Sequence, residues 1–231
     1  RDRLRSRGLG DVYKRQPLTS ISGNASVLIN NSGSLDENKK MQLYEVIYDD
    51  SLWLINLVEN LLSVTRIEDG KMNLHLETEL IEEVINEALN HISHKKDEHR
   101  IEVKANDEFI LAKIDAGLII QVIINIVDNA IKYTPKGSMI SIETFKHKDF
   151  VEIQIADDGA GISDKDKEKL FEMFYTVKHE VIDGRRGLGL GLALCKAIIV
   201  AHGGNIAVKD NIPHGTIFSF TLPIKEVEIH E

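Results

Sequence analysis

The sequence has little cysteine, proline or aromatic character, and it has no long uninterrupted apolar run. Cys195 is the single cysteine in 231 residues, which excludes an internal disulfide and favours a reducing compartment. The most apolar stretch, residues 118–127, contains Gln121 and Asn125 and is shorter than the about 20 residues that span a bilayer. These absences predict a soluble, cytoplasmic chain without a membrane contact of its own.

The charge is acidic overall but basic at the N-terminus. Residues 1–16 carry six basic and two acidic side chains, a net charge of +4, which leaves −13 for the remainder. An acidic body argues against nonspecific nucleic-acid binding, so no nucleic-acid partner is expected. The leader RDRLRSRGLGDVYKRQ lacks apolar periodicity and resembles translated sequencing-adaptor sequence. We therefore expect residues 1–16 to be a foreign or disordered leader.

Helical periodicity dominates residues 17–70. Apolar residues recur at spacings of three and four from Leu18 to Ile29, and NNSGSLD follows as a turn. A second helix is predicted over residues 37–68, with a near-heptad apolar stripe that Asp50 interrupts. This predicts a helical hairpin whose apolar surface exceeds what one partner helix covers. A homodimer forming a four-helix bundle would bury it; a monomer packing it on the second domain is the alternative.

Residues 71–231 have the mixed texture of an α+β sandwich, with the domain boundary near Gly70, where the helix is expected to stop. Alternating and continuous apolar segments predict strands over 72–76, 100–104, 109–114, 139–145, 151–156, 206–208 and 216–222. Periodic segments predict helices over 81–92, 118–133 and 193–201.

Three polar clusters in the second domain carry chemistry. In the first, Asn125, Asn129 and Lys132 share one face of an otherwise apolar helix. Amide oxygens suit a hard cation such as Mg²⁺, and a lysine can meet phosphate as a point charge. A helix face turned to water is the alternative.

The second cluster is Asp157-Asp-Gly159-Ala-Gly161, directly after a predicted strand. A carboxylate at a strand end can accept a hydrogen bond from an exocyclic amine such as that of adenine, and glycines allow a tight turn beneath it. An ordinary acidic turn is the alternative.

The third cluster is GLGLG, with Gly187, Gly189 and Gly191 ahead of an apolar helix. A dinucleotide fingerprint would follow a strand, whereas the charged segment TVKHEVIDGRR precedes this one. The placement favours a mobile polar loop over phosphates, with Lys178, Arg185 and Arg186 as available cations. A solvated charged loop is the alternative for each of these cations.

The order of these clusters resembles the Bergerat-type ATP site of histidine kinases, gyrases, Hsp90 chaperones and mismatch-repair ATPases, and histidine kinases fit best. Residues 125–133 resemble the N box, 157–161 and 187–191 the two glycine boxes, and FEMFY at 171–175 the F box. PLTSISGNASVLINN, YDDSLWLINLVENLLSVTRIEDG and DGRRGLGLGLALCKAIIVAHGG are similar to the kinase core of the potassium-sensing Kdp-system sensor kinases.

This resemblance implies ATP and Mg²⁺ as cofactors. At the base end it implies that Asp157 reads the adenine amine, with Tyr133, Gly159, Gly161 and Thr216 around it. At the phosphate end it implies the following residues: Asn129 as the metal ligand, Asn125 and Lys132 beside the metal and phosphates, the backbone of Gly187, Gly189 and Gly191 against the phosphates, and Arg185 or Arg186 on the transferring γ-phosphoryl group.

The phosphoacceptor histidine expected from the resemblance is absent. In the family it lies five residues before the proline of an H-[ED]-[LI]-R-[TS]-P-L segment, and Pro17 puts Val12 in that position. All nine histidines lie at His75 or later; His91, His94 and His99 are expected to be solvated. A truncated first helix behind a foreign leader is favoured over a natural loss, so the chain is expected to bind ATP without phosphorylating itself.

The resemblance implies the kinase core of a two-component sensor histidine kinase. It would phosphorylate a histidine for relay to a response-regulator aspartate, in a parent protein anchored at the inner or plasma membrane. The first alternative is a non-catalytic dimerisation module with a vestigial ATP site. The second is an ATP-driven clamp of the gyrase type, which carries a glutamate base at the position of Asn125.

Overall fold

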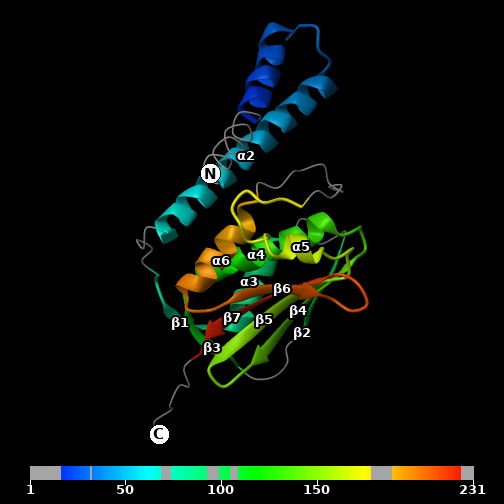
Figure 1. Cartoon of the computed structure of the whole chain (residues 1–231). Coiled ribbons are helices and arrows are strands. Elements are labelled where there is room, and N and C mark those ends of the chain that lie inside the picture. The colour runs from blue at the N-terminus through cyan, green and yellow to red at the C-terminus, as the bar shows by residue number, and fades with distance from the viewer. Residues whose placement is uncertain are drawn as a thin grey trace. The chain divides into compact units, whose positions relative to one another are not determined.

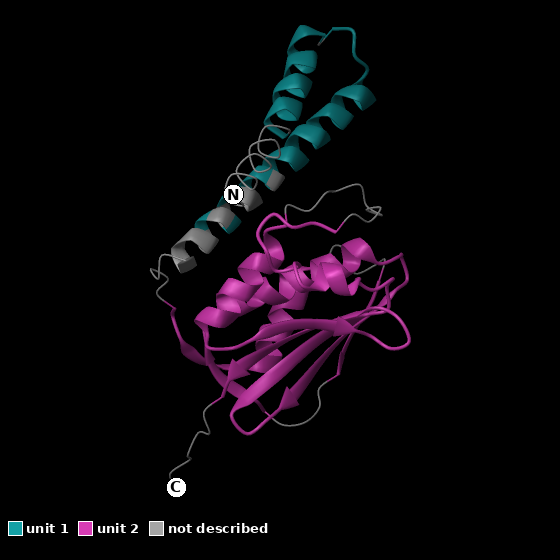
Figure 2. Cartoon of the chain, viewed as in Figure 1, with its two compact units in different colours: residues 1–63 teal, residues 64–231 magenta. Residues whose placement is uncertain are grey.

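The computed structural model describes residues 17–31, 33–68, 74–92, 99–104, 109–177 and 189–224. The predictions for residues 1–16, Gly70, Lys178, Arg185, Arg186 and Gly187 lie outside these residues. The chain divides into two compact units, residues 1–63 and 64–231, coloured separately in Figure 2. The division lies inside the helix α2 (Glu37–Glu68), and each unit is described by itself.

The first unit confirms the predicted helical hairpin. One helix covers residues 17–30, and α2 begins after a turn in which Asp36 Oδ1 accepts a hydrogen bond from the Lys39 N–H at 2.7 Å. Several apolar side chains of α2 stay about half exposed, among them Tyr44, Ile55 and Val58. The hairpin therefore leaves apolar surface that its own two helices do not cover.

The second unit is an α+β sandwich, as predicted. Its main sheet has the strand order β2-β4-β5-β7-β6, in which β2 and β4 are parallel and the other pairs antiparallel. These strands are β2 (Arg100–Lys104), β4 (Met139–Lys146), β5 (Phe150–Asp157), β6 (Ile206–Asp210) and β7 (Thr216–Pro223). The helices α3 (Ile81–His91), α4 (Ala116–Tyr133) and α6 (Gly191–Ala201) cover one face of the sheet (Figure 1).

The core lies between these helices and the sheet. Alternate residues of β5 and β7 are buried. Strand β5 packs on α4 and β7 packs on α6, and α4 also packs on α3 and α6. Ile123, Ile153 and Phe220 are fully buried there. Each such side chain contributes about 1.5–3 kcal/mol relative to an exposed one. This packing fixes the ends of α4, β5 and α6, where the polar clusters lie.

Helix α4 is also the one helix of the described residues that is long and apolar enough to cross a membrane by length and composition. Six of its side chains, however, are buried in the core of the second unit. A core helix has this composition too, because its apolar residues contact other elements on several sides.

Two details differ from the sequence prediction. The strand predicted over 72–76 is wrong over its described part: residues 74–76 carry no strand, residues 72 and 73 lie outside the described residues, and β1 (Glu77–Leu80) pairs with β3 (Leu111–Ile114) as an antiparallel ribbon. Leu76 is 41% exposed, so the alternation that suggested the earlier strand marks no buried face. A four-residue helix, α5 (Asp164–Lys167), was not predicted, because it is too short for an apolar period.

Candidate functional site

A cavity of about 450 Å³ opens in the second unit between α4, the loop after β5, the segment after α5 and the start of α6. Most of its wall is apolar or backbone. Its lining residues include Asn129, Tyr133, Asp157, Gly161, Gly189, Gly191 and Thr216, all of which the sequence singled out. Segments far apart in the chain therefore contribute to one cavity.

The last turns of α4 supply Asn129 and Tyr133 to the cavity. Asn125, one turn earlier, is not among the lining residues and instead lies against the start of α6: its Oδ1 is 3.6 Å from where a Cβ on Gly191 would be. Its Nδ2 is buried, and the Asn125 side chain also lies against the Cys195 thiol. Lys132 is also outside the lining, with Nζ 5.2 Å from the Tyr133 ring centroid.

Asp157, the last residue of β5, is 8% exposed and lines the cavity. Its Oδ1 accepts hydrogen bonds from the backbone N–H of Gly159 at 2.9 Å and of Thr216 at 3.2 Å. Burial raises the pKa of Asp157, and these two hydrogen bonds oppose the shift. With Oδ1 held by the protein, Oδ2 is the oxygen available to a ligand.

Glycines bring two loops together beneath Asp157. Gly215 has φ +114°, and a Cβ there would collide with the Asp157 carbonyl oxygen. Gly161 has φ +77°, and its Cβ position lies 3.3 Å from the Gly215 carbonyl oxygen. A Cβ on Gly159 would lie 2.8 Å from Thr134 Cγ2. Close backbone approach and a positive φ therefore favour glycine at positions 161 and 215, whereas at Gly159 the nearest atoms belong to side chains.

The glycine-rich segment enters the cavity at Gly189 and Gly191. Gly189 has φ +65°, and its carbonyl accepts a hydrogen bond from the Phe174 N–H at 2.8 Å. Helix α6 begins at Gly191, and its N-cap residue, Leu190, provides no side-chain cap. The first N–H groups of α6 are therefore open to an anion.

The apolar wall was only partly anticipated. Seven further lining residues lie outside the four boxes that the sequence singled out: Thr134, Ile162, Leu170, Thr176, Val177, Leu192 and Phe218. Of the F box, Tyr175 lines the cavity. The signal that could have found the wall is its position beside recognised motifs, since Thr134 follows the N box and Ile162 follows the first glycine box.

The prediction that His99 is solvated is wrong. His99 is 9% exposed, and its Nε2 lies 3.4 Å from the carbonyl oxygen of Thr134, which is itself buried and lines the cavity. It directly precedes β2, whose first residue, Arg100, pairs with Met139 of β4. The His99 ring therefore contacts the backbone of a residue that lines the cavity.

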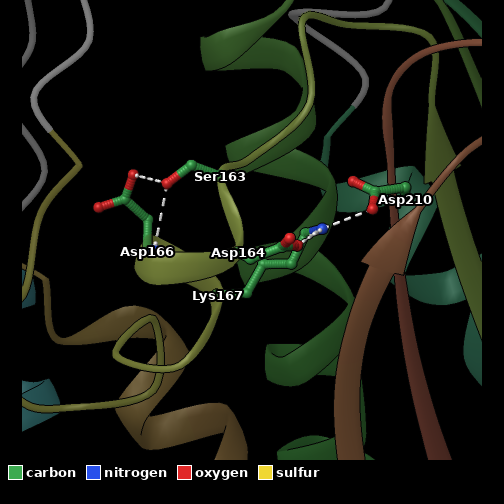
Figure 3. A network of polar contacts seen from close by, with 5 residues as sticks. All are labelled: Ser163, Asp164, Asp166, Lys167 and Asp210. Atoms are coloured by element: carbon green, nitrogen blue, oxygen red, sulfur yellow. Dashed lines mark hydrogen bonds and ion pairs between the residues drawn. The ribbon is translucent and has the colours of Figure 1, made fainter.

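A polar network fastens α5 next to the cavity (Figure 3). Lys167 Nζ contacts Asp164 Oδ1 at 2.9 Å and Asp210 Oδ2, at the end of β6, at 2.6 Å. The next residue, Asn211, donates from Nδ2 to the Asp157 carbonyl oxygen at 2.8 Å. The short helix, the end of β6 and the end of β5 are thus joined by direct contacts.

The chemistry of the site suits a nucleotide. The cavity offers apolar walls for a flat base, a buried carboxylate for an amine, an amide oxygen for a metal ion, and a helix N-terminus for phosphates. These groups lie on different elements but face one space.

Comparisons with known proteins agree. Residues 114–226 match the family described as histidine kinase-, DNA gyrase B- and HSP90-like ATPase, and residues 15–70 match the His kinase A (phospho-acceptor) domain. Sensor protein KdpD of Clostridium acetobutylicum is 42% identical over 96% of this chain and 25% of its own length. The chain spans 25%, 26% and 35% of the length of three curated relatives: KdpD, the non-motile and phage-resistance protein of Caulobacter vibrioides, and WalK of Bacillus subtilis.

Solved structures agree as well. Histidine kinase AdeS of Acinetobacter baumannii has a TM-score of 0.74 and 26% identity, over 92% of this chain and 97% of its own. Histidine kinase ThkA, in complex with the response regulator protein TrrA, has a TM-score of 0.71 and 25% identity, over 97% and 64%. On its two matched domains, its site and these similarities, the chain belongs to the sensor histidine kinase family, with an ATP-binding domain of the histidine kinase, gyrase and HSP90 type.

Proposed function

We propose that this chain is the kinase core of a two-component sensor protein. It binds Mg²⁺-ATP and transfers the γ-phosphoryl group to a histidine nitrogen, leaving ADP. The observation that carries the proposal is that Asn129, Asp157 and the glycine segment face one cavity. A vestigial site would not need to keep all three groups directed at the same space.

The geometry supports the roles of the residues that the structure describes, and the resemblance supports the role of Arg185 or Arg186. Asp157 accepts the adenine amine at Oδ2, while Gly159 and Thr216 hold Oδ1. Asn129 is the protein ligand of Mg²⁺, and the N–H groups at the start of α6 receive phosphate oxygens. Arg185 or Arg186 supplies positive charge to the γ-phosphoryl group. Asn125 supports the phosphate end from beside Gly191 without itself lining the cavity.

The partners are a second copy of the chain and a response regulator. The half-exposed apolar residues of α2 support the dimer, since a four-helix bundle would cover them. The complex of ThkA with TrrA supports the response regulator, whose aspartate would take the phosphoryl group. The similarity to KdpD supports a membrane-anchored, Kdp-type sensor kinase as the parent protein.

Because no histidine precedes His75, the hairpin of this chain offers no acceptor. Incubated with radiolabelled ATP and Mg²⁺, the chain by itself should therefore gain no acid-labile label. Mixed with a subunit that carries the acceptor histidine but has both Asn129→Ala and Asp157→Asn in its own ATP site, it should label that subunit.

The test of the proposal is the pair of assays together with calorimetry. Mg²⁺-dependent ATP binding and labelling of the complete subunit are the expected results. Binding without labelling would favour the non-catalytic dimerisation module. Steady ATP hydrolysis without an acceptor would favour the gyrase-type clamp, although Asn125 stands where those proteins carry a glutamate base.

A further inference from the structure

We infer that Asp166 is a positioning residue for the nucleotide cavity, acting through the hydroxyl of Tyr175. The inference rests on the proposed function and deepens it, because it assigns a role to a residue on α5 that does not itself line the cavity. Its consequence is that nucleotide affinity depends on one side-chain hydrogen bond outside the recognised motifs.

Both carboxylate oxygens of Asp166 accept hydrogen bonds. Its Oδ2 accepts a hydrogen bond from Ser163 Oγ at 2.5 Å, and its N–H donates back to the same hydroxyl at 3.3 Å. Ser163 is the N-cap of α5, so the pair closes the first turn of that helix (Figure 3). The carboxylate is thereby oriented, and its Oδ1 accepts the Tyr175 hydroxyl at 2.6 Å.

Helix α5 is itself fixed. Four residues cannot form a stable helix in isolation. The Lys167 contact with Asp210 ties α5 to the end of β6, and side-chain exposure of Lys167 is only 14%. Asp166 therefore acts from a fixed support rather than from a mobile surface turn.

Tyr175 connects Asp166 to the cavity through two contacts, one of its side chain and one of its backbone. Tyr175 lines the cavity. Its backbone lies against Gly189, where an added Cβ would lie 2.7 Å from the Tyr175 nitrogen. The preceding Phe174 has φ +65° and donates its N–H to the Gly189 carbonyl. We call this contact of Phe174 and Tyr175 with Gly189 the neck.

The backbone conformation of the neck needs contacts from other residues to hold it. A non-glycine residue in the left-handed region is strained, so Phe174 keeps that conformation only where its neighbours hold it. The Tyr175–Asp166 hydrogen bond is a side-chain tether on the residue directly after it. The same hydrogen bond is the main cause that raises the pKa of Tyr175.

The experiment is a double-mutant cycle read out as Mg²⁺-ATP affinity by calorimetry. We expect Tyr175→Phe and Asp166→Ala each to weaken binding about fivefold, the order expected for one partly exposed hydrogen bond to a carboxylate. The double variant should be no weaker than Asp166→Ala alone, because both changes remove the same bond. Asp166→Asn, which keeps an acceptor oxygen, should retain affinity within about twofold.

Asp164→Ala is the matched control. It removes an equal charge from the same helical turn, and the contact it breaks is with Lys167 rather than Tyr175. It should leave affinity within about twofold, and urea unfolding should confirm that every variant is folded.

Additive losses in the double variant, or an equal loss in Asp164→Ala, would overturn the inference and leave the proposed function standing. Absence of ATP binding by the unmodified chain would instead contradict the proposed function itself.

Discussion

Asp157 shows how a single residue can be placed for binding at a cost in stability. Its carboxylate is nearly buried, and burial is the main cause that raises its pKa above the ordinary 3.8. A raised pKa in the folded state means that folding favours the protonated acid. The stability that this residue contributes is therefore present at low pH and is lost as the pH rises through its folded-state pKa.

Asp157→Asn should separate stability from binding. The amide oxygen can still accept from Gly159 and Thr216, so the variant without ligand should be at least as stable as the original chain at pH 7. This advantage should shrink as the pH is lowered towards 3.8. ATP affinity should fall about tenfold or more, because an NH₂ group replaces the charged acceptor of the adenine amine. Urea unfolding and calorimetry measure the two effects; lower stability at pH 7 would contradict this reading.

Gly215 is the second residue that the site requires. Gly215→Ala should lower the free energy of unfolding by about 2 kcal/mol or more, because it adds a collision with the Asp157 carbonyl to the strain of a positive φ. Gly137→Ala is the control, since Gly137 also has a positive φ but has open space around it. It should cost about 1 kcal/mol. Equal losses in urea unfolding would show that close approach at Gly215 is unimportant.

At the scale of elements, α4 joins the site to the core. Asp115 is its N-cap: Oδ1 accepts from the Leu118 N–H at 3.3 Å, and Oδ2 accepts from the His75 N–H at 3.1 Å. The N–H of Asp115 in turn donates to His202 Nε2, just past the end of α6. One residue thus links the chain before β1 to the ends of two helices.

Asp115→Ala should lower stability by about 1–2 kcal/mol, since it removes a helix cap and the bond to His75. Amide hydrogen exchange should become faster in the first turn of α4. The loss of stability in Asp115→Asn should be smaller, because asparagine is an equally good N-cap. Unchanged exchange in Asp115→Ala would mean that the cap is dispensable.

Periodicity explains what could be predicted at this scale. The hairpin, the helices of the second unit and the β4–β5 hairpin carry strong repeats, and the structure has them where predicted. Strand β1 was misplaced and α5 missed, because each is four residues long. The burial of His99, the contact of Asn125 with α6 and the collision that excludes a side chain at Gly215 depend on residues distant in sequence. No local pattern contains them.

For the whole molecule, we expect a dimer whose ATP sites do not depend on dimerisation. Ile55 and Val58 of α2 are each 52% exposed. Replacing both with glutamate should produce monomers in sedimentation equilibrium, because charges would be buried in the bundle. ATP affinity should stay within about twofold, since the cavity is built from the second unit alone.

Gln42→Glu is the matched control, because it adds charge at an exposed polar position of the same helix and should leave a dimer. A monomeric original chain, or an unchanged dimer after the Ile55 and Val58 substitutions, would exclude α2 as the dimer surface.

The most direct test of the central claim is a crystal structure of the chain with Mg²⁺ and a non-hydrolysable ATP analogue. We expect the adenine amine within hydrogen-bond distance of Asp157 Oδ2, the metal ion on Asn129 Oδ1, and phosphate oxygens at the N-terminus of α6. A nucleotide bound elsewhere, or in this cavity with its base away from Asp157, would contradict that claim.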